Sequence, residues 1–135
     1  MIYVTRREVF SAAHRLFNPE LSEAENDLIF DKCNNINGHG HNYVLEVVVA
    51  GEINPKTGYV IDLKKLKKII KDFVISKVDH KHLNFDTDFL KGKIPTAENI
   101  SVGIWYQLVD KIDEGKLYSV KVFETENNYA EYKGE

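Results

Sequence analysis

The sequence is short of cysteine, of long apolar runs and of surplus positive charge, and each shortage excludes a class of protein. One residue of 135 is cysteine, so no internal disulfide can form, and we expect the reducing cytoplasm as the compartment. No apolar run is long enough for a transmembrane span, and charged residues come too early for a signal peptide. A net charge of -3 gives no general attraction to nucleic acid. We therefore expect neither a membrane nor a nucleic-acid partner.

Length and composition are those of an ordinary globular protein. Hydrophobic residues make up 43% and charged residues 29% of the chain. A chain of this length can bury a core of its own. We therefore expect one domain over residues 1–135.

The most informative pattern is a pair of histidines, His39 and His41, separated by one glycine. Alternate side chains of an extended strand share a face, so both imidazoles would point the same way. His14, at the end of another predicted strand, could supply a third nitrogen. Three protein ligands leave tetrahedral zinc one open position, which is the catalytic arrangement. A chance His-x-His is common in a chain with five histidines, so this pattern alone leaves metal binding open.

The remaining pattern predicts four strands and two helices. Strands are expected over residues 2–14, 39–51, 117–124 and 129–133. Asp62 is expected to cap a helix of about four turns, and Thr96 to cap a second helix. Residues 15–38 and 79–95 are interpreted as connections, the first long, polar and irregular. The order ββααββ predicts an α+β fold, a four-stranded antiparallel sheet with both helices on one face.

Several blocks of the chain resemble the 6-pyruvoyl-tetrahydropterin synthase family. The blocks cover residues 10–16 (FSAAHRL), 32–43 (KCNNINGHGHNY), 79–84 (DHKHLN), 96–99 (TAEN), 120–128 (VKVFETENN) and 132–135 (YKGE). The resemblance implies the tunnelling fold (T-fold), in which the sheets of neighbouring subunits join into an intersubunit β-barrel. It also implies a homo-hexamer, a dimer of trimers, with active sites between subunits.

The same resemblance implies an activity and the residues that carry it. The family are zinc lyases that convert 7,8-dihydroneopterin triphosphate to 6-pyruvoyl-tetrahydropterin and release triphosphate, in tetrahydrobiopterin biosynthesis. By resemblance, His14, His39 and His41 hold Zn²⁺. Cys33 acts as a general base in its thiolate form, which a nearby dication favours. Asp79 and His80 match the family's proton-transfer pair, expected from a neighbouring subunit.

Substrate recognition is assigned to three other residues. Glu124 matches the family's pterin anchor, because a carboxylate can accept two hydrogen bonds from the 2-amino group and the ring N–H of a pterin. Thr96 and Glu98 lie in the segment that also lines the pterin pocket. Ala97 stands where the family often has a second threonine.

Two alternatives stay open. Cys33 could be the fourth ligand of a closed Cys-His₃ structural zinc, which would make the protein a binding module. The related 6-carboxy-tetrahydropterin synthases of deazaguanine (queuosine) biosynthesis share the fold, the zinc and the cysteine, but resemble a shorter Cys-x₃-His-x-His pattern. This chain has Cys-x₅-His-x-His, which favours the pyruvoyl group.

Overall fold

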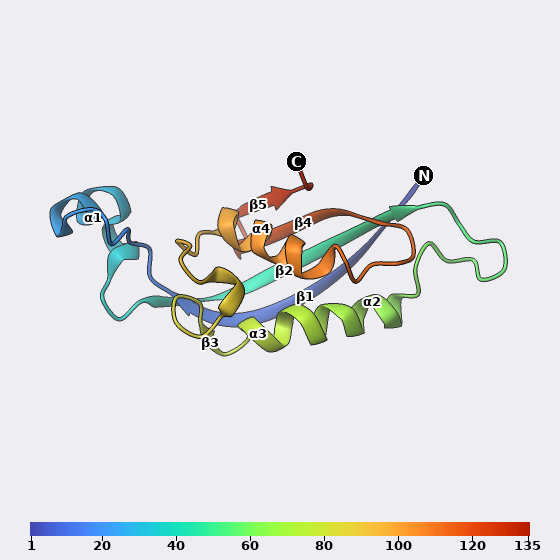
Figure 1. Ribbon diagram of the computed structural model, residues 1–135, viewed down its shortest axis with the longest axis horizontal. Helices are drawn as coiled ribbons and strands as arrows, with labels where there is room; N and C mark the ends of the chain where they lie inside the picture. Colours follow the sequence, from blue (N-terminus) through green and yellow to red (C-terminus); the bar gives the residue numbers. More distant parts are fainter.

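A computed structural model describes residues 1–135, and a twisted sheet runs along its long axis (Figure 1). The sheet has five strands in the order β3-β1-β2-β4-β5. Their bounds are β1 (Ile2–His14), β2 (His39–Gly51), β3 (Lys81–His82), β4 (Lys116–Thr125) and β5 (Asn128–Tyr132). The four predicted strands are confirmed and pair antiparallel. The fifth, β3, was not predicted: two residues run parallel to the outer edge of β1.

The two predicted helices begin at their predicted caps. The Asp62 side chain accepts from the Lys64 N–H, and the Thr96 side chain accepts from the Asn99 N–H. The first helix continues from α2 (Leu63–Ile70) through a π-helical turn, η2 (Lys71–Ile75), into α3 (Ser76–Val78). The second is α4 (Ala97–Leu108). A short 3-10 turn, η3 (Asp88–Leu90), lies between them.

The segment over residues 15–38 is more regular than predicted. It contains α1 (Glu23–Phe30) and a 3-10 turn, η1 (Asp31–Asn34). A capping box starts α1: the Glu25 N–H donates to Ser22 Oγ while the Glu25 carboxylate accepts from the Ser22 N–H. Together α1 and η1 project beyond the end of the sheet (Figure 1).

The helices cover one face of the sheet, as the ββααββ order predicts. Alternate residues of β2 point to that face, and Tyr43, Leu45 and Val47 are fully buried there. They belong to one hydrophobic core with side chains of α2 and α4. The other face has no helix over it. No helix of the chain is both long and apolar enough to cross a bilayer.

Strand register sets the position of the histidines. His14 and His39 are partners in the last pair of the β1–β2 ladder, and Ala12 pairs with His41. His14, His39 and His41 therefore share the helix-covered face of the sheet, at the end from which α1 projects.

Candidate metal centre

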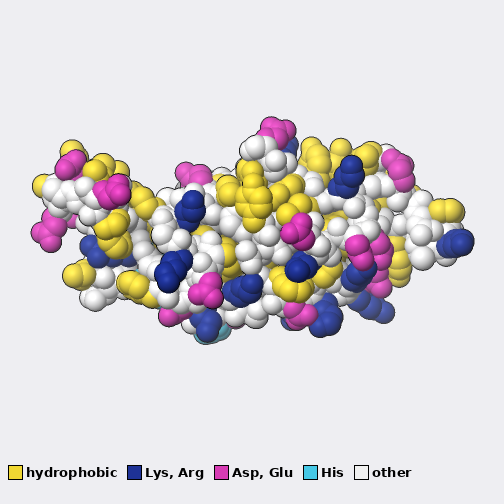
Figure 2. All heavy atoms as spheres, in the orientation of Figure 1, with side chains coloured by type: hydrophobic (Ala, Val, Ile, Leu, Met, Phe, Trp, Pro, Cys, Tyr) yellow, Lys and Arg dark blue, Asp and Glu magenta, His cyan; other side chains and the backbone are white.

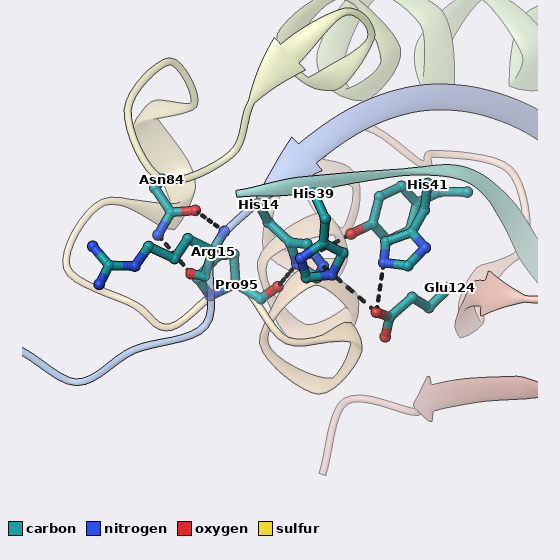
Figure 3. Close-up of polar contacts among 8 residues, drawn as sticks. His14, Arg15, His39, His41, Asn84, Pro95 and Glu124 are labelled. Atoms are coloured by element: carbon teal, nitrogen blue, oxygen red, sulfur yellow. Dashed lines mark hydrogen bonds and ion pairs between the residues drawn. The ribbon is translucent and has the colours of Figure 1, made fainter. Parts of the chain in front are cut away.

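The three predicted histidines converge at one point (Figure 3). The Nε2 atoms of His14 and His39 are 3.1 Å apart. Glu124, from β4, joins them: its Oε1 lies 2.9 Å from His41 Nε2 and 3.5 Å from His14 Nε2. One ligand atom from each of these four side chains falls within 4.8 Å of the others. The group has the size and donor chemistry of a metal centre.

His14 is held by a buried hydrogen bond on its far nitrogen. Its side chain is fully buried, and Nδ1 lies 2.7 Å from the carbonyl oxygen of Pro95. A carbonyl only accepts, so Nδ1 carries the hydrogen and Nε2 presents a lone pair to the site. The Tyr43 hydroxyl lies 3.2 Å from the same Nδ1. This backbone bond is the kind that orients a metal-ligating histidine.

The protonation of the site fits a bound cation. Burial, together with the neighbouring histidines, lowers the pKa of His14 below its ordinary value. Burial also lowers the pKa of His41. The Nε2 atoms of His14 and His39 are close enough together for both to contact one small cation. Three imidazole nitrogens with one carboxylate oxygen are donors that suit zinc.

Cys33 lies beside this group and not within it. It is half-buried on η1 and lines a cleft of about 780 Å³ with His39. The thiol is not among the four converging side chains, which disfavours the closed Cys-His₃ alternative. Burial raises the pKa of Cys33, and the charges of Glu124 and Asp31 raise it further. A bound dication would lower the pKa of Cys33, because it favours the thiolate.

Asp79 and His80 form the predicted pair, but at a separate place on the chain. His80 Nδ1 lies 3.0 Å from Asp79 Oδ2. Asp79 Oδ1 accepts a hydrogen bond from the Ser11 N–H, which is the main reason that the pKa of Asp79 is lowered. The His80 side chain is 83% exposed and lines a surface depression with Ser11 and Gly40, apart from the cleft of Cys33. Within one chain this pair does not join the histidines.

The other predicted residues lie in different settings. Thr96 Oγ1 accepts from the Asn99 N–H at 3.2 Å, so it acts as a helix cap. Glu98 is exposed in the first turn of α4. Glu124 is the one that adjoins the histidines (Figure 3).

Sequence reasoning missed two residues that support the site, Pro95 and Tyr43. Tyr43 could have been found, because it continues the alternation of His39 and His41 on the same face of β2. Pro95 acts through its backbone carbonyl, and no residue-type pattern reports such a contact.

Fold and site together define an α+β protein with a cluster of histidines at one end of its sheet and a cysteine in the adjoining cleft. Comparison with known proteins narrows this class. The family described as 6-pyruvoyl tetrahydropterin synthase matches residues 3–135. The chain belongs to this family.

Individual relatives agree over almost the whole chain. A protein of Homo sapiens named 6-pyruvoyl tetrahydrobiopterin synthase is 48% identical over 132 residues, which cover 98% of this chain and 91% of that protein. A solved structure of Caenorhabditis elegans 6-pyruvoyl tetrahydropterin synthase is 44% identical, with a TM-score of 0.94 over 99% of this chain and 96% of that one. A 6-carboxy-5,6,7,8-tetrahydropterin synthase of Rickettsia bellii is 29% identical, covering 97% of this chain and 99% of that protein.

Proposed function

We propose that the protein converts 7,8-dihydroneopterin triphosphate to 6-pyruvoyl-tetrahydropterin and releases triphosphate, as a zinc-dependent lyase of the cytoplasm that acts as one domain. The observation that carries the proposal is the convergence of His14, His39 and His41 beside a cleft that holds Cys33. Family membership supports the substrate class. The identity of 48% to a pyruvoyl synthase against 29% to a carboxy synthase supports the pyruvoyl product.

The three histidines would hold Zn²⁺ through their Nε2 atoms. Zinc bound there would polarise the side-chain oxygens of the substrate, which makes the neighbouring carbon-bound protons more acidic. Cys33 is assigned to removing such a proton, since its thiol borders the same cleft as His39. Pro95 and Tyr43 keep His14 in its ligating tautomer.

Glu124 is assigned to the pterin ring. Its carboxylate is 26% exposed, so a ligand can reach it, and a bidentate contact to the two N–H donors of the pterin edge would place the side chain of the substrate near the histidines. Thr96 and Glu98, at the start of α4, are assigned to the wall of the same pocket.

Asp79 and His80 are assigned to a neighbouring subunit. Within one chain neither residue lines the cleft of Cys33, yet the carboxylate already orients the imidazole. An exposed carboxylate–imidazole pair is suited to passing protons to a site on another copy. We therefore propose a homo-hexamer of two stacked trimers with shared active sites.

The sheet supports such an assembly. Strand β5 and most of β1 are open edges, and β5 runs antiparallel to β1, so copies can join β5 to β1 with antiparallel pairing throughout. On the face without helices, Arg7, Glu46, Lys121 and Glu131 are successive partners across the sheet. Their charges alternate, so Glu131 of one copy would meet Arg7 of the next and continue the alternation.

The test uses the substrate itself. Purified, zinc-loaded protein is incubated with 7,8-dihydroneopterin triphosphate, and products are identified by mass while released triphosphate is measured. We expect 6-pyruvoyl-tetrahydropterin with one triphosphate for each product. Formation of 6-carboxy-tetrahydropterin as the main product would establish the alternative.

The role of Cys33 has a separate test. Cys33→Ala is expected to keep its zinc and lower turnover by about 10²–10⁴-fold, the usual cost of losing a general base. Metal analysis accompanies the rate measurement. Loss of zinc from this variant would show that Cys33 is a ligand and would favour the structural-zinc reading.

A further inference from the structure

The segment that carries Cys33 is tied to the end of β1 by a compact set of hydrogen bonds. The Leu16 N–H donates to the Cys33 carbonyl at 2.8 Å. The Arg15 guanidinium meets Asn34 at the next position: Nε donates to the Asn34 carbonyl at 3.1 Å, and Nη2 donates to Asn34 Oδ1 at 3.0 Å. Two consecutive residues of one segment therefore hold two consecutive residues of the other.

Further contacts hold both Arg15 and Asn34 in place. The Arg15 N–H donates to Asn84 Oδ1 and Asn84 Nδ2 donates to the Arg15 carbonyl, each at 2.8 Å (Figure 3). The Arg15 guanidinium also lies 4.2 Å from the centre of the Phe17 ring. Asn34 Nδ2 donates to Asp27 Oδ1 at 2.8 Å, which sets the orientation of its amide. A fork held on all sides loses little freedom when it binds its acceptors.

The contact joins the two functional parts of the proposed site. Arg15 follows the ligand His14 directly, and Asn34 follows Cys33 directly. We propose that Arg15 and Asn34 form a clamp that fixes the thiol of Cys33 relative to the metal centre, so that Arg15 is a positioning residue for the reaction; this rests on the proposed function. The elements η1 and α1 project beyond the end of the sheet (Figure 1). Without the clamp, the only hydrogen bond left between residues 15–16 and residues 33–34 would be the one from the Leu16 N–H to the Cys33 carbonyl.

An alternative role for Arg15, direct binding of the triphosphate, is disfavoured by its surroundings. The carboxylates of Glu23, Asp27 and Asp31 line the same cleft as Arg15 and Lys32. The negative charges outnumber the positive ones, so the lining gives a triphosphate no net attraction. The donors Nε and Nη2 are also already taken by Asn34.

The test is a double-mutant cycle on zinc-loaded protein with Arg15→Lys, Asn34→Ala and the two combined. Arg15→Lys keeps the charge but removes the fork. We expect kcat to fall about 10²-fold in each variant, the cost of a misplacement near 1 Å, while KM and zinc content change little. The double variant should be no worse than either single one, because both remove the same contact.

The second readout is independent of turnover. Cys33 is the only cysteine, so the rate of alkylation by iodoacetamide reports its accessibility without further engineering. We expect alkylation about tenfold faster in each variant, since hydrogen bonds of ordinary net strength no longer hold η1 closed. Arg6→Lys, the same substitution earlier on β1, serves as the control and should change neither readout.

A rescue variant guards against a merely structural effect. The double variant Asn34→Asp with Asp27→Asn exchanges the two side chains. It keeps an acceptor for Arg15 and a hydrogen-bond donor between positions 27 and 34. Both kcat and the alkylation rate should therefore return to the values of the unaltered protein. Unchanged kcat and alkylation in Arg15→Lys and Asn34→Ala, with turnover still dependent on Cys33, would refute the clamp alone. A raised KM confined to Arg15→Lys would establish Arg15 as a substrate contact. Full turnover by Cys33→Ala would instead refute the proposed role of the cysteine.

Discussion

Among single residues, Glu124 has two candidate roles, as a contact to the pterin and as a ligand of the metal. It is assigned to the pterin, and its Oε1 also lies 2.9 Å from His41 Nε2. That atom of His41 is buried, so the carboxylate lies directly against a side chain that is assigned to the metal. Since three histidine nitrogens suffice for zinc, the carboxylate is free to serve the substrate.

The first prediction separates these roles. Glu124→Gln should keep the zinc, because the three histidines remain, and should bind neopterin tens-fold more weakly. Charge-assisted hydrogen bonds are worth about 1.5–3 kcal/mol each, and glutamine presents a donor where an acceptor is needed. Calorimetry with neopterin and metal analysis measure the two effects, with Glu126→Gln as control. A variant without zinc would make Glu124 a fourth ligand, and undiminished neopterin binding would place the pocket elsewhere.

The histidines at the metal centre also set a pH dependence. His14 and His41 have lowered pKa values in the folded protein, whereas in the unfolded chain they titrate near 6.5. As pH falls below that value, the unfolded chain gains protons that the folded one does not, so acid favours unfolding. The free energy of unfolding of zinc-free protein should fall by about 1.4 kcal/mol between pH 7.5 and 5.5 for each histidine that stays neutral.

Urea titrations of zinc-free protein at pH 7.5, 6.5 and 5.5, at one protein concentration, measure this dependence. His14→Asn lacks one of the titrating groups and should show a shallower dependence. Stability that is flat or increases on acidification would contradict the assignment of neutral, buried histidines.

At the scale of elements, the turn that enters β2 is tightly constrained at Gly38. Gly38 has a φ of +75°, and a Cβ there would lie 2.9 Å from the His14 carbonyl oxygen and from His82 Nε2. Gly58 has a similar φ of +78° but nothing within 4 Å of a Cβ position. The two glycines therefore share the backbone requirement and differ only in the space available.

This difference makes a matched pair of variants. Gly58→Ala should cost about 1–2 kcal/mol, the penalty of a left-handed residue with a Cβ. Gly38→Ala should cost about 2–4 kcal/mol, because overpacking adds to that penalty, and should also weaken zinc binding. Urea unfolding and zinc titration measure both. Equal effects of the two substitutions would show that the close approach to His14 and His82 has no consequence.

Elements with a regular alternation or a helical spacing of apolar residues could be predicted from the sequence. Elements that depend on contacts between distant segments could not. Alternation along β2 predicts that His39 and His41 share a face with the buried residues, and the structure agrees. The helix α1 was missed although Ser22 and Glu25 form a capping box, because the surrounding residues are polar and lack a helical apolar stripe. Strand β3 has two residues, too few for any period.

The site follows the same division. Residue type and spacing single out His14, His39 and His41 as candidate ligands, and the resemblance to the family assigns them to zinc. The Pro95 carbonyl and the approach of Glu124 to His41 depend on how β4 and α4 pack against β2, which only the folded chain defines. The contact of Arg15 with Asn34 likewise joins segments whose spacing in sequence carries no signal.

At the scale of the whole molecule, two features of the surface bear on the proposed assembly. The projecting α1 carries apolar and acidic side chains, and Leu28 and Ile29 are 85% and 60% exposed (Figure 2). The face of the sheet without helices carries the alternating row from Arg7 to Glu131. Exposed apolar groups and open edges of this kind favour contact between copies.

The alternating row of charges predicts that exchanging the charges of Arg7 and Glu131 restores an assembly that a single substitution weakens. Arg7→Glu places like charges at the proposed β5–β1 contact between copies and should shift the proposed hexamer toward smaller species. Adding Glu131→Arg exchanges the two charges and should restore the size of the unaltered protein. Light scattering at several concentrations measures both, and Lys64→Glu on the exposed face of α2 is the control. A double variant as dissociated as the single one would contradict this register, and an unaltered monomer at micromolar concentration would contradict the assembly.

The pairing of His14 with His39 in the last rung of the β1–β2 ladder has a consequence for folding. If β1 is shifted by one residue against β2, the His14 side chain lies on the opposite face of the sheet from His39 and His41. If β1 is shifted by two residues, His14 returns to the same face but no longer pairs with His39. Each of these misaligned chains loses a ligand. A metal held by His14, His39 and His41 would therefore bind only one alignment of the two longest strands, and its binding energy would favour the correctly aligned sheet.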